Sequence, residues 1–309
     1  MENIHRSIIP LVVILAPTTS GKSDLGIHLA KKFNGEIISA DSRQVYKGLD
    51  IGTGKVTQAE QKMVKHYLLN LVKPGVRFNV AEYKKIADTA IFNIWKRGKV
   101  PFLVGGSPLY IQVVVDNYLL PEGVSDTLIR AKLEHTSLIK LLGQLKKVDP
   151  ESYSIIDNKN KRRVVRALEV YHVTGTQFSL FQKRGEDRYN AFLLGIDMPR
   201  EVLYRRIDDR VDSRVQHGMI QEVEELLQKG VSPEWLASLG LEYRFISNYL
   251  LQTDRSEEAR GHMLQKLKYA IHDFARRQLT WFRHEKRIHW IETQKEAEKD
   301  VQKFLMVSN

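Results

Sequence analysis

A short run of small and polar residues at the start of the chain has the composition of a phosphate-binding loop. It reads Ala16-Pro17-Thr18-Thr19-Ser20-Gly21-Lys22-Ser23 and follows the apolar segment Leu11–Leu15. The Walker A pattern, Gly-x4-Gly-Lys-Ser/Thr, is met except that Ala16 replaces the first Gly. Loop amides and the N-terminus of a following helix would bind phosphate oxygens, Lys22 would add positive charge, and Ser23 would offer its hydroxyl to Mg²⁺. The alternative is a glycine turn that merely ends a strand.

A carboxylate follows the next apolar segment, Glu36–Ala40, at Asp41. The carboxyl ends of neighbouring parallel strands meet at one edge of a sheet, so Asp41 is expected close to the phosphate loop. It could hold Mg²⁺ through water, act as a general base, or serve only as a helix cap or turn residue. Kinases, NTPases and transferases that release diphosphate all use such loops, so these residues alone predict a phosphate site and not a reaction.

The elements that must position these residues can be read from the apolar segments. Five segments are predicted as buried strands: Leu11–Leu15, Glu36–Ala40, Pro101–Val104, Phe192–Ile196 and Ile288–Ile291. Helical periodicity lies between them, as in Ser23–Phe33 and Val80–Arg97. This alternation predicts an α/β fold, a P-loop doubly wound parallel sheet. Residues 121–190 contain helical patterns without a convincing strand, so we expect a helical insertion that divides the core into 1–120 and 191–309.

Composition narrows the class of protein further. The 309 residues carry 48 basic and 37 acidic side chains, a formal charge of +11, which favours a polyanionic partner such as RNA. The insertion itself holds 13 basic and 9 acidic residues. The chain has no Cys, which excludes a disulfide scaffold, a thiol nucleophile and a Cys-ligated zinc finger. No apolar run approaches the ~20 residues of a membrane span. We therefore expect a cytoplasmic protein without a membrane partner.

Five motifs in order resemble those of the tRNA dimethylallyltransferase family, also called tRNA isopentenyltransferases. The most specific is Ser-Ala-Asp-Ser-Arg-Gln-Val-Tyr-Lys-Gly-Leu-Asp-Ile-Gly-Thr at 39–53, followed by Val-Gly-Gly-Ser-Pro-Leu-Tyr at 104–110. Three Arg-rich stretches, 162–171, 205–211 and 275–283, are similar to later helices of the family. The resemblance covers nearly the whole chain.

The resemblance implies transfer of a dimethylallyl group from dimethylallyl diphosphate to the exocyclic N6 amine of the adenosine 3′ of the anticodon. Asp41 would be the general base and Ser107 would orient the reacting groups. The loop from Ala16 to Ser23 would bind the diphosphate with Mg²⁺ on Ser23. Arg210, and after it Arg206, would be further diphosphate ligands; the alternative for both is a solvated helix charge.

The same resemblance implies contacts with the tRNA anticodon stem-loop and a monomeric state. An adenine must leave the RNA stack to react, and the segment Asp41–Gln44 would read its edge. The residues implied to touch tRNA are Asp41, Ser42, Arg43, Gln44, Ser107, Arg130, Arg162, Arg163 and Arg166. An Arg-rich helix is often only a solvated face, but the net charge favours RNA.

The sequence departs from the family pattern at several positions, and two other functions are also compatible with its motifs. Ser107 stands where Thr is usual, Pro108 where Gly is common, and Gly240–Arg244 replaces a Gly-Tyr-Lys/Arg stretch that touches tRNA. One rival is a P-loop nucleotide or small-molecule kinase, which would bind ATP. The other is a non-catalytic RNA-binding module, which leaves the phosphate loop and Asp41 unexplained.

Overall fold

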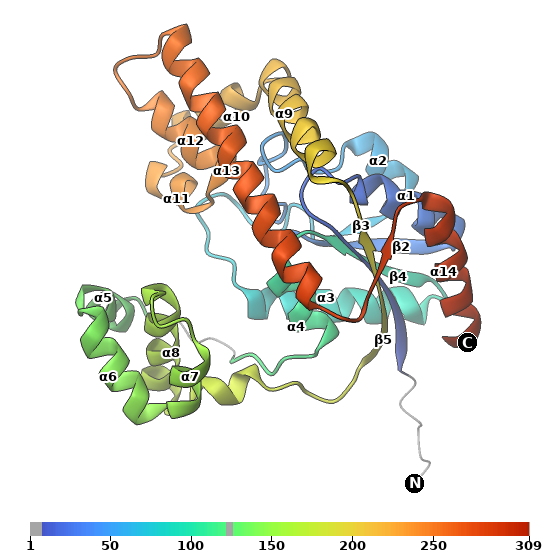
Figure 1. Cartoon of the computed structure of the whole chain (residues 1–309), viewed down its shortest axis with the longest axis horizontal. Coiled ribbons are helices and arrows are strands. Elements are labelled where there is room, and N and C mark those ends of the chain that lie inside the picture. Colours follow the sequence, from blue (N-terminus) through green and yellow to red (C-terminus); the bar gives the residue numbers. More distant parts are fainter. Residues whose placement is uncertain (1–7, 122–125, 309) are drawn as a thin grey trace. The chain divides into compact units, whose positions relative to one another are not determined.

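The computed structural model describes residues 8–121 and 126–308 and divides into two compact units (Figure 1). Unit 1 comprises 1–111 with 188–309, and unit 2 comprises 112–187. Unit 1 contains a six-stranded sheet in the order β3-β2-β4-β1-β5-β6, with every neighbouring pair parallel. The strands are β1 Ile9–Leu15, β2 Gly35–Ala40, β3 His66–Tyr67, β4 Val100–Gly105, β5 Tyr189–Ile196 and β6 Ile288–Ile291. The predicted parallel α/β fold is confirmed; β3, only two residues long, had no sequence signal.

Helices cover both faces of this sheet, as right-handed crossovers between parallel strands require. α1 (Lys22–Lys32) and α14 (Gln294–Ser308) share one apolar core with the sheet, where Val12, Phe102 and Val301 are buried. α3 (Val80–Lys96) packs on the opposite face and buries Tyr83. The short α2 (Gln58–Met63) precedes β3, and α4 (Pro108–Val115) follows β4. In the observed register Leu15 and Ala40 both lie opposite Gly105, so β1, β2 and β4 end at the same level of the sheet.

Five further helices of unit 1 form a second core beside the sheet. They are α9 (Arg200–Gln216), α10 (Met219–Gln228), α11 (Pro233–Ser238), α12 (Leu241–Leu250) and α13 (Glu257–His284). The loop after β2 belongs to the same core, because Val45 and Leu49 are fully buried in it beside Ile207 and Tyr243. The chain segment that carries Asp41 is therefore anchored at both ends, to the sheet and to the helices.

Unit 2 is helical, with a small core of its own. Its helices are α5 (Thr127–His135), α6 (Leu138–Val148), α7 (Pro150–Ile155), α8 (Lys161–Thr174) and a 3₁₀ turn at Phe178–Gln182. Leu141, Leu145 and Leu168 are fully buried among them. Apart from a one-residue bridge between Tyr118 and Arg184, the described part of this unit contains no strand. This unit spans 112–187, where the sequence predicted a helical insertion at 121–190. In the described ranges of the whole chain, no helix is long and apolar enough to cross a membrane.

Candidate active site

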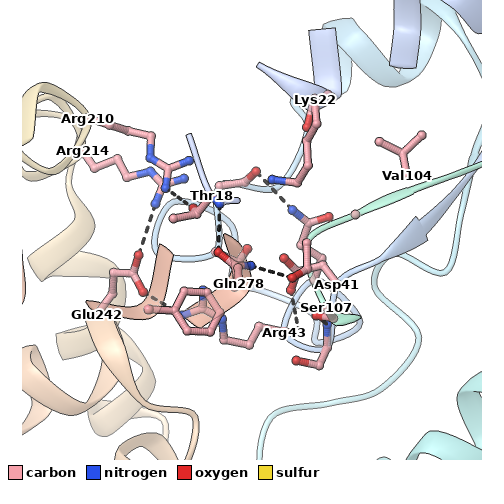
Figure 2. Close-up of a pocket in the computed structure, with 18 residues that line it drawn as sticks. Thr18, Lys22, Asp41, Arg43, Val104, Ser107, Arg210, Arg214, Glu242 and Gln278 are labelled. Atoms are coloured by element: carbon pink, nitrogen blue, oxygen red, sulfur yellow. Dashed lines mark hydrogen bonds and ion pairs between the residues drawn. The ribbon is translucent and has the colours of Figure 1, made fainter. Parts of the chain in front are cut away.

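A cavity lies in unit 1 at the carboxyl ends of β1, β2 and β4 (Figure 2). Loops that follow these three strands supply one side, and α9, α12 and α13 supply the other. The lining includes Thr18, Lys22, Ser23, Asp41, Ser42, Arg43, Gln44, Ser107, Arg210, Arg214, Glu242 and Gln278. A crevice at the carboxyl edge of an open parallel sheet is the usual ligand site of α/β folds.

The loop before α1 leaves its polar groups free for an anion. Gly21 is the N-cap of α1 with φ 88°, and it has no side chain to satisfy the first amides of the helix. Thr19 also has a positive φ, 71°, which is uncommon for a residue other than glycine. The buried hydroxyls of Thr19 and Ser20 find no hydrogen-bond partner among the described residues. Unsatisfied donors at a helix N-terminus fit a phosphate group that would complete them.

The same cavity offers ligands suited to Mg²⁺. The Ser23 hydroxyl and the Asp41 carboxylate both line it, and both are oxygen donors. Among the described residues no three His, Asp or Glu side chains gather as a complete metal site. Magnesium in phosphate sites commonly takes one or two protein oxygens and completes its shell with phosphate and water. Ser23 and Asp41 therefore fit a metal that arrives with a phosphorylated substrate.

The turns after β2 and β4 hold Asp41 and Ser107 side by side. The Ser42 amide donates to the Ser107 hydroxyl at 3.2 Å, and the Ser107 amide donates to the carbonyl of Ala40 at 3.2 Å. The Asp41 carboxylate accepts the Arg43 amide at 2.9 Å. A Cβ at Gly105 would lie 2.1 Å from the Ala40 carbonyl oxygen, so only glycine permits this approach of the two strand ends.

The side-chain amide of Gln44 is already engaged within the protein. Its Oε1 accepts the Ser39 hydroxyl at 2.9 Å, and its Nε2 donates to the carbonyl of Gly54 at 3.2 Å. These contacts fix the turn that carries Asp41. One N–H of Nε2 and one lone pair of Oε1 remain for an adenine edge, because Gln44 lines the cavity and an amide offers two of each.

Three polar or charged residues of the cavity were not predicted from the sequence, because they come from distant helices. Gln278 on α13 is 5% exposed; its Oε1 accepts the Thr18 amide at 3.0 Å and its Nε2 donates to the carbonyl of Gly106. Arg214 on α9 and Glu242 on α12 form an ion pair at 3.4 Å. Gln278 and Glu242 lie in stretches singled out as motifs or departures, but nothing in the local pattern indicated that their side chains reach the phosphate loop.

The cavity is strongly electropositive. Burial, reinforced by the neighbouring Arg210, lowers the pKa of Lys22 to about 8. Burial and the nearby Arg214 lower the pKa of Arg210 to about 9. Arg210 donates to the Thr18 hydroxyl and so reaches the phosphate loop from α9 (Figure 2). Closely spaced, poorly hydrated cations stabilise a bound anion, and a diphosphate carries the required charge.

The other arginines predicted from the sequence fall into two groups. Arg206 on α9 is exposed and does not line the cavity. Arg162 and Arg163 are exposed in the first turn of α8. Arg130 and Arg166, by contrast, form ion pairs with Glu169, at 3.6 and 2.9 Å, and the Glu169 side chain is completely buried. Arg130 thus joins α5 to α8 within unit 2, whereas Arg166 pairs with Glu169 inside α8.

Comparison with known proteins places this geometry in a family. Residues 44–285 match the family model described as IPP transferase. The chain is 42% identical over 294 residues to a tRNA dimethylallyltransferase of Pelotomaculum thermopropionicum, covering 94% of this chain and 92% of that one. It is also 42% identical over 303 residues to one of Carboxydothermus hydrogenoformans, covering 96% of each chain.

Solved structures agree with these sequence relatives. A tRNA isopentenylpyrophosphate transferase of Bacillus halodurans superposes with a TM-score of 0.70 at 35% identity, over 97% of this chain and 96% of that one. A eukaryotic dimethylallyltransferase described as acting on tRNA gives a TM-score of 0.76 at 27% identity, over 92% and 74%. The predicted transferase function is confirmed over the kinase and over a non-catalytic RNA-binding module, and the chain belongs to the IPP transferase family of tRNA dimethylallyltransferases.

Proposed function

We propose that the cavity binds dimethylallyl diphosphate and transfers its five-carbon group to N6 of the adenosine 3′ of the anticodon in tRNA. The observation that carries this proposal is the meeting of a phosphate loop with a carboxylate, Asp41, in one cavity. A phosphate cradle alone would serve a kinase equally well. A base placed beside the cradle, together with the family membership, favours alkylation of a weak nucleophile.

The leaving diphosphate would be bound by the loop amides from Thr19 to Ser23 and by Lys22 and Arg210. As the bond between carbon and oxygen breaks, negative charge grows on the oxygen that joined the allylic carbon to the nearer phosphorus of the diphosphate. The desolvated cations stabilise that charge without having to reorient. Ser23 would hold Mg²⁺, which when bound would supply Lewis-acid stabilisation of the phosphate oxygens. Asp41 would meet the metal only through water, so that its carboxylate stays free to accept a proton.

The nucleophile requires a proton acceptor because the lone pair of an adenine amine is delocalised into the ring. In the proposed step the N6 nitrogen bonds to the allylic carbon, diphosphate departs, and one N6 proton passes to the Asp41 carboxylate. The backbone amide of Arg43 fixes that carboxylate from one side. Ser107 lies next to it and would orient the amine through its hydroxyl.

The experiment is a transfer assay with purified protein, unmodified tRNA, dimethylallyl diphosphate and Mg²⁺. Nuclease digestion followed by mass spectrometry should find one adenosine, adjacent to the anticodon, that is heavier by one five-carbon unit. A parallel reaction with ATP in place of the diphosphate tests the kinase alternative. Binding of tRNA without any adduct would instead support the RNA-binding module and contradict this proposal.

A further inference from the structure

Glu242 is an acidic residue in a cavity that must bind an anion. Its side chain is 2% exposed and reaches the cavity from the first turn of α12. Among the described residues the cavity lining contains four cations, Lys22, Arg43, Arg210 and Arg214, and two carboxylates, Asp41 and Glu242. A carboxylate that repels diphosphate must contribute something else to the site.

The contacts of Glu242 indicate its role in the site. One carboxylate oxygen accepts from Arg43 at 2.7 Å, and the other accepts from Arg214 at 3.4 Å. Arg43 belongs to the turn after β2 that carries Asp41, whereas Arg214 extends from α9, one helical turn beyond Arg210. Figure 2 shows Glu242 between these two arginines. A single buried carboxylate therefore links the segment that carries the base to the helix that carries the diphosphate ligand.

The electrostatics of the three residues are consistent with one mutually dependent group. The two guanidinium groups lower the pKa of Glu242, and Glu242 together with Asp41 raises the pKa of Arg43, although burial acts against the charged form in both. Burial and the neighbouring Arg43 lower the pKa of Arg214, and Glu242 is the largest influence that favours its charged form. Removing the carboxylate would leave two buried guanidinium groups without their counter-ion.

We propose that Glu242 is a positioning residue that fixes the Asp41 turn and withholds Arg214 from the diphosphate. Its negative charge limits how tightly the cavity binds diphosphate, and its geometry sets where the base stands. The inference rests on the proposed transfer reaction. The proposal requires that removal of the Glu242 charge raises the affinity for diphosphate and lowers the turnover. A residue that merely stabilised the fold would not move these two quantities in opposite directions.

The test compares Glu242→Gln with the parent protein in two assays. Isothermal titration calorimetry with inorganic diphosphate should show affinity about 3- to 10-fold higher in the variant, because the cavity gains one net positive charge. Transfer at saturating substrates should fall at least about tenfold, since the Asp41 turn loses its anchor. Affinity that is unchanged or weaker, or a parental turnover, would overturn the proposal.

Two further variants test whether the change in diphosphate affinity comes from Arg214 and is specific to Glu242. The double variant E242Q/R214Q should return diphosphate affinity to the parental range, because the released cation is gone; persistent tightening would contradict the role given to Arg214. Glu36→Gln is the matched control: Glu36 is also buried and paired with two cations, Arg97 and Lys99, but lies at the other end of β2. It should leave diphosphate affinity unchanged.

A third variant serves if Glu242→Gln does not fold. Glu242→Asp keeps the charge but shortens the reach, so diphosphate affinity should stay within about twofold while transfer slows about tenfold. Parental transfer by this variant would overturn the proposal. If the parent protein binds diphosphate but forms no adduct on tRNA, the proposed function fails and not the assignment of Glu242 as the limit on affinity.

Discussion

Asp41 is the residue on which the proposed chemistry depends most directly. Replacing it by Asn keeps the shape and the hydrogen bond from the Arg43 amide but removes the proton acceptor. We expect kcat to fall by about 10²–10⁴, the usual contribution of a positioned general base, with little change in tRNA affinity. Single-turnover transfer and filter binding of tRNA measure the two separately. Near-normal turnover of the Asn variant would remove Asp41 from the mechanism.

Lys22 gives the cavity a measurable pH dependence. Burial and Arg210 lower its pKa to about 8, so the free protein loses this charge as pH rises through that value. A group that carries its charge only below about pH 8 attracts diphosphate below that pH and less strongly above it. Affinity for inorganic diphosphate should therefore decline between about pH 7 and 9. The Lys22→Met variant should bind diphosphate weakly at every pH, and its affinity should fall less between about pH 7 and 9 than that of the parent protein. An identical pH profile in both proteins would contradict this assignment.

Helix α13 holds two loops at strand ends together through one side chain. Gln278 accepts from the amide of Thr18 and donates to the carbonyl of Gly106, which joins the loops after β1 and β4. Replacing it by Leu would leave both backbone groups unsatisfied, at a cost of about 1–3 kcal/mol. Urea denaturation should show the loss, and diphosphate affinity should fall with it because the loop is no longer fixed. The exposed Gln221 on α10, changed to Leu, is the control.

The exposed and the ion-paired arginines of unit 2 predict two different phenotypes. Replacing Arg162 and Arg163 by Ala should weaken tRNA binding and lower the log–log salt slope by about 0.7–0.9 for each lost phosphate contact, without changing stability. Arg166→Ala removes a partner of the buried Glu169 and should destabilise the protein by about 1–3 kcal/mol. Salt titrations of tRNA binding and thermal unfolding distinguish the two. A stable Arg166→Ala protein with a reduced salt slope would move Arg166 to the RNA-contacting group.

The elements also show why part of the site could be predicted and part could not. The phosphate loop and Asp41 are local patterns: each stands at the end of an apolar strand, and parallel strands bring such ends together by rule. Arg214, Glu242 and Gln278 enter the cavity from α9, α12 and α13, and their arrival depends on how five helices pack in a separate core. The strand β3 was not predicted for a different reason, because a segment of two residues is too short to show a repeating pattern of apolar residues.

Unit 2 is connected to the rest of the chain through two adjacent segments. The amide of Gly185 donates to the carbonyl of Asn117 at 3.0 Å, and Tyr118 pairs with Arg184. Replacing residues 119–183 by a short Gly/Ser linker should therefore leave the sheet and the phosphate loop intact. The shortened protein should unfold cooperatively and bind inorganic diphosphate at the parental affinity, while its affinity for tRNA falls by orders of magnitude as anionic contacts are lost. Normal tRNA modification by this protein would make unit 2 irrelevant to RNA.

The position of β1 in the sheet also determines when this strand can complete its pairing during synthesis on the ribosome. β1 lies between β4 and β5, so one of its edges stays unpaired until residues 189–196 have left the ribosome. Translation of the intervening residues 106–188 takes roughly 4–17 s at about 5–20 residues per second. During that interval the apolar strand Ile9–Leu15 presents an open edge, which is a template for aggregation. Ribosome-stalled chains that end before β5 should thus be cleaved by protease within β1, whereas chains long enough to expose β5 outside the exit tunnel should be protected there.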